Sequence, residues 1–257
     1  NDGKIKKIVK NTYNLNRYVG AFGNEGIILK AKLKIKKIKS ENVLLKTKIL
    51  KNINEVKKEF NYKSDYHYIQ LDPFFRKKHF AISFKADSLK SNKNYYKSIN
   101  LNANIFEKKF FRFFGFFINS FTWKIFYKFF FLLNNNLNMI LDIHNFHYNS
   151  KYKHLIPLVC QKGLLDYEIL IKKNFNNEMT KIINTLKKNK IYPMYIIVKK
   201  LYKSKKKFYY SFNDNGYAVA ISLNKKKLNY KNFEDFKNLL NKNKYQVNLS
   251  KTDEKLI

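Results

Sequence analysis

The sequence predicts an α+β fold in which helices cover an antiparallel sheet. The first observation is the order of apolar segments between residues 164 and 251, which is strand, helix, strand, strand, helix, strand. The second is their periodicity, because strand segments alternate apolar and polar residues, whereas helical segments repeat apolar residues every three or four positions. This order is the split βαββαβ arrangement of a ferredoxin-like sheet. Since that fold hosts many functions, it does not by itself predict one.

Each element of this unit has its own local pattern. Apolar residues at helical spacing, such as Met179, Ile182 and Leu186, predict helices around 179–186 and 233–240. Alternating or continuous apolar runs bounded by turn residues predict strands. These strands are expected at 164–171, 195–201, 216–223 and 245–249, with a further short strand at 208–212.

The segment before this unit contains a glycine-rich loop. Gly20, Gly23 and Gly26 are three of the seven glycines in the chain, and an alternating apolar and Lys pattern predicts a half-buried strand over 27–38. Glycine-rich loops can hold a phosphate, but those loops normally lead into a helix, so spacing alone favours a tight turn here. The other expected elements are a hairpin strand at 4–9, strands at 41–49, 66–71 and 80–84, a helix marked by Ile53, Val56 and Phe60, and a loop over 86–107.

The stretch from Phe110 to Leu133 is dense in aromatic residues. Lys109, Arg112, Lys124 and Lys128 interrupt it, and a charge at mid-bilayer costs about 2.5 to 3.5 kcal/mol on insertion scales, so we do not expect it to cross a membrane. Three alternatives stay open. The stretch is an amphipathic helix lying on a membrane, a helix packed on the core, or a surface that stacks on single-stranded nucleic acid.

The composition is strongly basic and nearly free of cysteine. The chain has 53 Lys and Arg against 18 Asp and Glu, a formal charge of +35. Such a charge is typical of proteins that bind an acidic polymer or an anionic membrane, but a coding bias toward Lys and Asn would also produce it. The single cysteine, Cys160, excludes an intramolecular disulfide and fits a reducing compartment, so we expect a cytoplasmic protein with Cys160 as a buried small hydrophobic residue.

A search for catalytic motifs finds no centre. His144 and His147 form an H-x-x-H pair beside Asp142, but a metal site needs three or four ligands and no nearby Cys or H-E-x-x-H pattern supplies them. We therefore expect no metal centre. A nucleophile elbow of the G-x-S-x-G type is absent from the sequence as well.

Several segments along nearly the full length are similar to one known family. Asp2-Gly3 and residues 19–28 are similar to the family's Asp-Gly turn and glycine-rich loop, residues 200–203 to its Lys-Leu-Phe-Gly segment, and residues 244–252 to its C-terminal Gly-Gly-Arg-Leu-Tyr-x-Ala-Lys-Asp segment. The family is the FAD-dependent oxidases of the vanillyl-alcohol-oxidase class, in the branch that includes decaprenylphosphoryl-β-D-ribose 2′-oxidase. The resemblance implies the C-terminal end of an FAD-binding α+β domain at 1–40, and a substrate domain at 41–257 with an aromatic-rich insertion at 108–133.

The resemblance also implies a set of site residues. Lys200 and Lys251 take the positions of the family's active-site lysines, whose charge would hold an anionic sugar-lipid or stabilise charge on the flavin and substrate. Asn248 stands where the family has a flavin-contacting Tyr, and Gln70 where it has an aromatic residue. The implied set is Lys200 and Lys251 as catalytic residues, Gly23, Gly26, Ile28 and Asn248 as FAD-binding residues, and Gln70, Asp166, Glu168 and Tyr202 as substrate-binding residues.

The function implied by the resemblance is oxidation of a sugar alcohol by hydride transfer to FAD. The expected substrate is a polyprenyl-phosphate-linked ribose or a similar sugar, and the family's pyrophosphate loop precedes the region matched here, so we expect a missing N-terminal half to bind most of the FAD. The other expected partners are an NAD(P)-dependent reductase and a peripheral membrane contact, whereas nucleic acid is not expected. The alternative is a non-enzymatic basic protein that binds nucleic acid or an anionic membrane surface.

Overall fold

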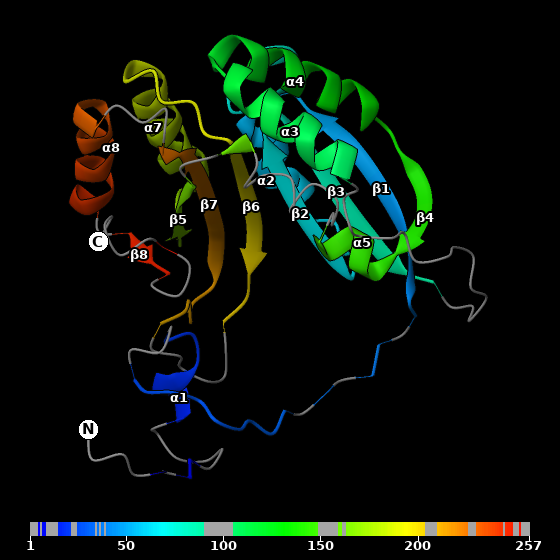
Figure 1. Cartoon of the computed structure of the whole chain (residues 1–257), viewed down its shortest axis with the longest axis vertical. Helices are drawn as coiled ribbons and strands as arrows, with labels where there is room; N and C mark the ends of the chain where they lie inside the picture. The colour runs from blue at the N-terminus through cyan, green and yellow to red at the C-terminus, as the bar shows by residue number, and fades with distance from the viewer. Residues whose placement is uncertain are drawn as a thin grey trace.

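The computed structural model confirms the α+β fold, with eight strands in one antiparallel sheet within the described part of the chain (Figure 1). The described residues are 5, 7–8, 15–21, 25–33, 35, 37–38, 40–89, 105–148, 159–160, 163–203, 210–225, 230–243, 245–248 and 252.

The C-terminal half of the sheet has the elements that the sequence predicts. Apolar residues recur at helical spacing in both of its helices, and the buried side chains of the first helix are those of the expected face, including Met179, Ile182 and Leu186. The elements are β5 (Leu164–Ile171), α7 (Phe175–Lys188), β6 (Tyr195–Leu201), β7 (Gly216–Asn224), α8 (Tyr230–Lys242) and β8 (Gln246–Val247).

The N-terminal half of the sheet contains a long helical insertion. The aromatic stretch forms two helices rather than one, because Asn119 caps the second helix, and its side chain accepts hydrogen bonds from the backbone N–H groups of Phe121 and Thr122. The elements are β1 (Asn42–Leu50), α2 (Ile53–Glu59), β2 (Tyr66–Leu71), the 3-10 helix η1 (Lys77–His79), β3 (Ala81–Ser88), α3 (Ile105–Phe117), α4 (Ser120–Leu133), β4 (Asn138–Asp142) and α5 (Ile143–Tyr148).

The two halves of the sheet share one topology. The strand order is β4-β1-β3-β2-β6-β7-β5-β8, and all paired neighbours are antiparallel. In β5 to β8 the fourth strand lies beside the first, and the third lies between the first and second, which is the predicted ferredoxin-like order. The strands β1 to β4 repeat the same order. The two units meet where β2 pairs with β6, with Gln70 opposite Ile197.

The two faces of the sheet are covered differently. On one face α2, α7 and α8 pack on both units, and a single buried core runs from Val56 through Ile69 to Ile182 and Phe236. On the other face α4 and α5 pack on β1 and β3, with Tyr127 and Phe131 buried against them. Figure 1 shows α3, α4 and α5 over the β1 to β4 unit, while β6 and β7 are seen without a helix in front of them.

Three sequence predictions are wrong for the described residues. The described residues of 4–9, of 27–38 and of 208–212 are not in strands. In the second case Leu33 and Ile35 are 81% and 90% exposed, because none of the eight strands pairs with this segment and an isolated strand has no partner for its backbone groups. A short helix, α1 (Leu15–Tyr18), precedes the glycine-rich loop. Cys160 is buried, as expected, and burial raises the pKa of its thiol to about 11.

Candidate substrate-binding face

The side of β6, β7 and β5 that faces away from α7 and α8 is a candidate functional surface, which we call the open face. Strand alternation and pairing place Ile197, Ala220 and Glu168 in one row across it, because Ile197 is opposite Ala220 and Ala220 is opposite Glu168. Gln70 extends this row on β2. The row therefore has a polar residue at each end, Gln70 and Glu168, and two apolar residues, Ile197 and Ala220, between them.

Glu168 and Asn248 form the polar end of this row. The Asn248 backbone N–H donates to the Glu168 carbonyl at 2.8 Å, and the Asn248 side-chain amide donates to the Glu168 carboxylate. The Glu168 N–H donates to Thr252 Oγ1 at 3.2 Å. The Glu168 carboxylate is therefore buried but hydrogen-bonded, as a buried charged group must be.

A second hydrogen-bonded cluster occupies the neighbouring row. Ser222 lies between Asp166 and Tyr195 in the strand register, and its hydroxyl donates to the Asp166 carboxylate. Burial, and then the negative charge of Asp166, raise the pKa of the Tyr195 hydroxyl, which therefore stays protonated at neutral pH. The cluster offers an exposed carboxylate next to a protonated phenol.

Gln70 is held in place by the α4 helix. Its side-chain amide donates to the Tyr127 hydroxyl at 2.9 Å, and that hydroxyl donates to the Met194 carbonyl at 2.7 Å. Burial raises the pKa of Tyr127, so the phenol is a permanent donor. The sequence gives no sign of this contact, because Tyr127 is one of many aromatic residues in the insertion.

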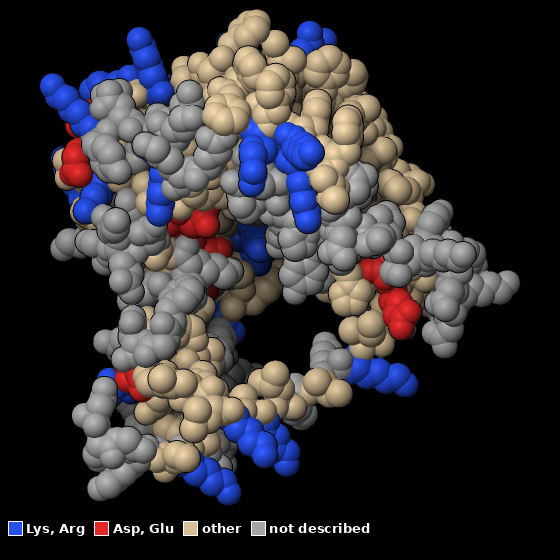
Figure 2. Space-filling model, viewed as in Figure 1, with Lys and Arg blue, Asp and Glu red and all other residues tan. Residues whose placement is uncertain are grey.

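Apolar groups close the two ends of the open face. At one end Tyr195 and Leu164 pack against a cluster that contains Ile118 and Cys160. At the other end Phe212 covers Leu170 and Ala218. Between these ends Ile197 and Ala220 are only partly buried. Figure 2 shows acidic side chains gathered over β5 and β7 beside a hollow in the surface.

Lys200 and Tyr202 are not brought together with these residues. Val198 and Ile196 lie in the core beneath the helices, so alternation places Lys200 on the helix-covered face. There its ammonium donates to the Phe60 carbonyl at 3.4 Å and lies 5.8 Å from the centroid of the Tyr202 ring. The same alternation places Lys199, which the sequence analysis did not select, on the open face.

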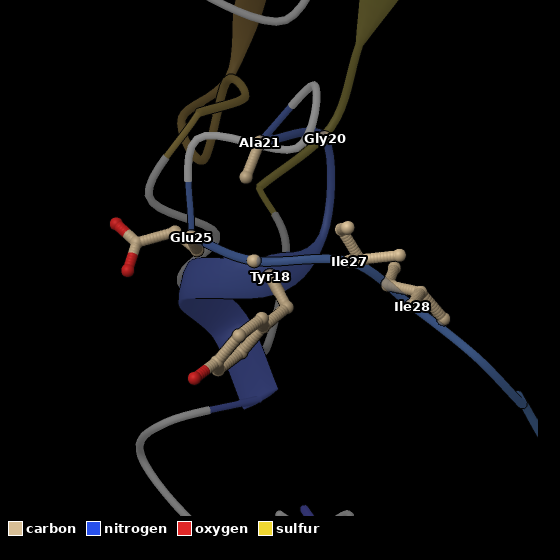
Figure 3. A pocket seen from close by; sticks show the side chains of 7 residues that line it. Tyr18, Gly20, Ala21, Glu25, Ile27 and Ile28 are labelled. Atoms are coloured by element: carbon tan, nitrogen blue, oxygen red, sulfur yellow. The ribbon is translucent and has the colours of Figure 1, made fainter. Parts of the chain in front are cut away.

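The glycine-rich loop forms a separate small cavity. Gly26 has φ of 130°, a conformation that favours glycine, and a Cβ there would meet nothing within 4 Å. The loop is tied to the connection between β6 and β7, because the Tyr210 hydroxyl donates to Glu25 Oε1 at 3.1 Å. The cavity has a volume of about 420 Å³ and is lined by Tyr18, Gly20, Ala21, Glu25, Gly26, Ile27 and Ile28 (Figure 3).

This cavity fits one part of FAD and not another. Its described lining is mostly apolar and suits a flat flavin ring, with Gly26 and Ile28 among the residues that would contact it. Glu25, the charged residue of that lining, forms an ion pair with Arg17 at 3.2 Å and points away from Ile27 and Ile28 in Figure 3. Since no described Lys or Arg lines the cavity, the FAD diphosphate does not fit there.

Other predicted residues lie elsewhere or outside the described chain. Gly23 and Lys251 fall outside the described residues. The backbone N–H of His144 donates to Asp142 at 2.6 Å, and the described residues contain no group of three His, Cys, Asp or Glu side chains that could hold a metal ion. None of the described helices is both long enough and apolar enough to cross a bilayer.

Comparisons with known proteins leave the family open. No protein-family model matches the chain, and no curated protein matches it either. The fold and the open face are therefore the basis for assigning a function.

Proposed function

We propose that this chain carries the substrate-binding part of an FAD-dependent oxidoreductase that oxidises a hydroxyl group of a phosphate-linked sugar. The observation that carries the proposal is the position of Gln70, Asp166 and Glu168, with Asn248, on one face of the sheet. The resemblance selected these residues from three separate segments. Alternation puts Asp166 and Glu168 on the same face of β5, but it does not decide on which face Gln70 and Asn248 of the other segments lie, so their agreement is not forced by the sequence.

The open face supplies the groups that alcohol oxidation needs from a protein. FAD, when bound, accepts the hydride from the substrate carbon. The hydroxyl proton must then pass to a base, and Asp166 is an exposed carboxylate on this face. Tyr195 lies in the same cluster and donates rather than accepts, because its pKa is raised. We assign proton acceptance to Asp166 and hydrogen bonding to the sugar hydroxyls to Gln70. Glu168 and Asn248, which the resemblance gives to substrate and to FAD, are buried and bonded to each other, so we assign them the positioning of this face.

Lys199 is the cation that suits an anionic substrate. A phosphate group next to the sugar needs a positive charge on the same face as the polar row. Lys199 is exposed on that face, whereas Lys200 is directed to the helix-covered face. We therefore transfer to Lys199 the role that the resemblance gives to Lys200.

In this proposal the glycine-rich loop would hold the flavin ring. The contact between Tyr210 and Glu25 joins the loop to the β6 to β7 connection, at the end of the strands that carry Lys199. The diphosphate has no cationic partner in the cavity, so the proposal requires residues elsewhere in the gene product to bind it.

The experiment is a spectroscopic measurement on the complete gene product. We expect it to purify with the absorbance of bound flavin. Farnesylphosphoryl ribose, a short-chain member of the proposed substrate class, should bleach that absorbance without oxygen. The Asp166→Asn variant should slow the bleaching by about 10²- to 10⁴-fold, because it removes the proton acceptor.

The matched control is Asp235→Asn, which removes an equally exposed carboxylate on α8. It should leave the rate unchanged. A complete gene product that neither carries flavin nor binds added FAD would contradict the proposal.

A further inference from the structure

The helices α3 and α4 present a large apolar surface that the fold does not use. Eleven of their described apolar side chains are 41% to 77% exposed, among them Phe106, Phe113, Phe117, Phe121 and Phe129. Isolated exposed apolar residues are normal on a protein surface, but a contiguous group marks a surface that meets another apolar phase. Figure 2 shows the surface over α3 and α4 as mostly uncharged.

The orientation of α4 keeps this apolar surface on the outside of the protein. With 3.6 residues per turn, Ile125 and Phe129 lie on the side of α4 opposite Tyr127 and Phe131, which are buried against the sheet. The Tyr127 hydroxyl is fixed to the Met194 carbonyl, and Asn119 caps the helix. Turning the apolar side inward would therefore break the core of the first unit.

Apart from Glu107, whose side chain lies outside the described part of the structure, the charges on these helices are of one sign. Every charged side chain described on α3 and α4 is a Lys or Arg, and all five are exposed: Lys108, Lys109, Arg112, Lys124 and Lys128. Helical spacing places Lys124 and Lys128 on the flank between the buried and the exposed apolar sides of α4. Long cationic side chains at such a border can lie along an apolar surface while their charge reaches water or headgroups. Figure 2 shows Lys and Arg along the lower border of the uncharged surface.

The two helices are too short to cross the bilayer core end-on. They contain 13 and 14 residues, which at about 1.5 Å rise per residue is about 20 Å, against a hydrocarbon thickness of about 30 Å. Helices with this pattern of aromatic residues and flanking cations lie in the plane of the membrane interface.

We propose that the α3 and α4 hairpin docks the protein on an anionic membrane, with its exposed aromatic side in the acyl boundary and its lysines at the headgroups. A second copy of the chain fits less well, because pairing two such surfaces would bring two cationic borders together. Nucleic acid fits less well because phosphates need cations across the contact, whereas the centre here is apolar. The proposal is independent of the oxidase proposal.

The test is flotation of the purified chain with lipid vesicles. We expect binding to phosphatidylcholine vesicles that contain phosphatidylglycerol, and weaker binding to phosphatidylcholine alone. Changing Phe113→Glu and Phe129→Glu together should lower the partition coefficient about a hundredfold or more.

The matched control changes Leu33→Glu and Ile35→Glu, which are apolar residues away from the hairpin and even more exposed than Phe113 and Phe129. It adds the same charge and should keep most of the binding. The proposal is overturned if both double variants bind alike. It is also overturned if the unchanged chain ignores vesicles but forms a dimer that the Phe113→Glu and Phe129→Glu changes dissolve.

Discussion

The two βαββαβ units of this sheet have the same strand order and differ in what covers them. In the first unit the link between β3 and β4 is the long hairpin of α3 and α4, and α4 packs on the face opposite α2. In the second unit the corresponding link is the single helix α8, which packs on the same face as α7. As a result, described helices cover both faces of the first unit but only one face of the second.

Because of this difference, the two units present different kinds of surface. The covered unit offers its outer helical surface, and the open unit offers a sheet face with polar residues. The two units remain one folding body, because the core beneath α2, α7 and α8 contains residues of both, such as Val56 and Phe236. The largest expected effects therefore come from changes in the buried cores on the two faces of the sheet.

Removing a buried aromatic ring from either unit should destabilise both. Phe131 and Phe236 are both fully buried, one in each unit, and Phe→Ala at such sites costs about 3 to 5 kcal/mol. In urea, Phe131→Ala and Phe236→Ala should each lower the midpoint of Trp123 fluorescence and of far-UV circular dichroism together.

The control for this prediction is Phe129→Ala, on the exposed side of the same helix as Phe131. It should change the free energy of unfolding by no more than about 0.5 kcal/mol. Separate unfolding transitions for the fluorescence and the circular dichroism would contradict the prediction, because they would mean that the two units unfold independently.

A smaller effect is expected from the pH dependence of the first unit. His67 lies 3.0 Å from the Ser83 hydroxyl, and burial together with the charge of Lys85 lowers its pKa from 6.5 to about 4. The unfolded chain then binds a proton near pH 6.5 that the folded chain does not take up until about pH 4. Stability contributed by neutral His67 is thus fully present above pH 6.5 and is lost as pH falls toward 4.

Replacement His67→Gln removes this proton linkage. Urea unfolding between about pH 7 and about pH 4.5 should show a shallower loss of stability in the variant than in the unchanged chain. Parallel pH profiles would show that His67 takes up its proton equally in both states. All five histidines of the chain precede β5, so the second unit contains no histidine whose protonation could change its stability in this pH range.

The second unit was predictable from sequence and the first was only partly so. Residues 164–171 and 195–201 are apolar runs with clear bounds, and the structure has strands at those positions. Strands β1, β2 and β3 were also expected, but β4 was not, because apolar and polar residues do not alternate over Asn138–Asp142. Without β4, the repeat of the βαββαβ order could not be recognised.

It was harder to predict on which face of the sheet a strand residue lies than to predict the strand itself. Ile196, Ile197 and Val198 are all apolar, so the sequence does not indicate which side of β6 meets the core. The structure buries Ile196 and Val198, which sends Lys199 to the open face and Lys200 to the other. The segment 27–38 shows the reverse case, since its clear alternation has no neighbouring strand among those described.

The adjacent lysines of β6 give the most direct test of the open face as a substrate site. In the complete gene product with flavin bound, the rate of anaerobic flavin reduction by farnesylphosphoryl ribose would be compared for Lys199→Ala and Lys200→Ala. The account predicts a loss of about 10²- to 10³-fold for Lys199→Ala, since it removes a charge that stabilises the reacting substrate, and a rate close to that of the unchanged protein for Lys200→Ala. A large loss for Lys200→Ala with a normal rate for Lys199→Ala, or no loss in either variant, would contradict it.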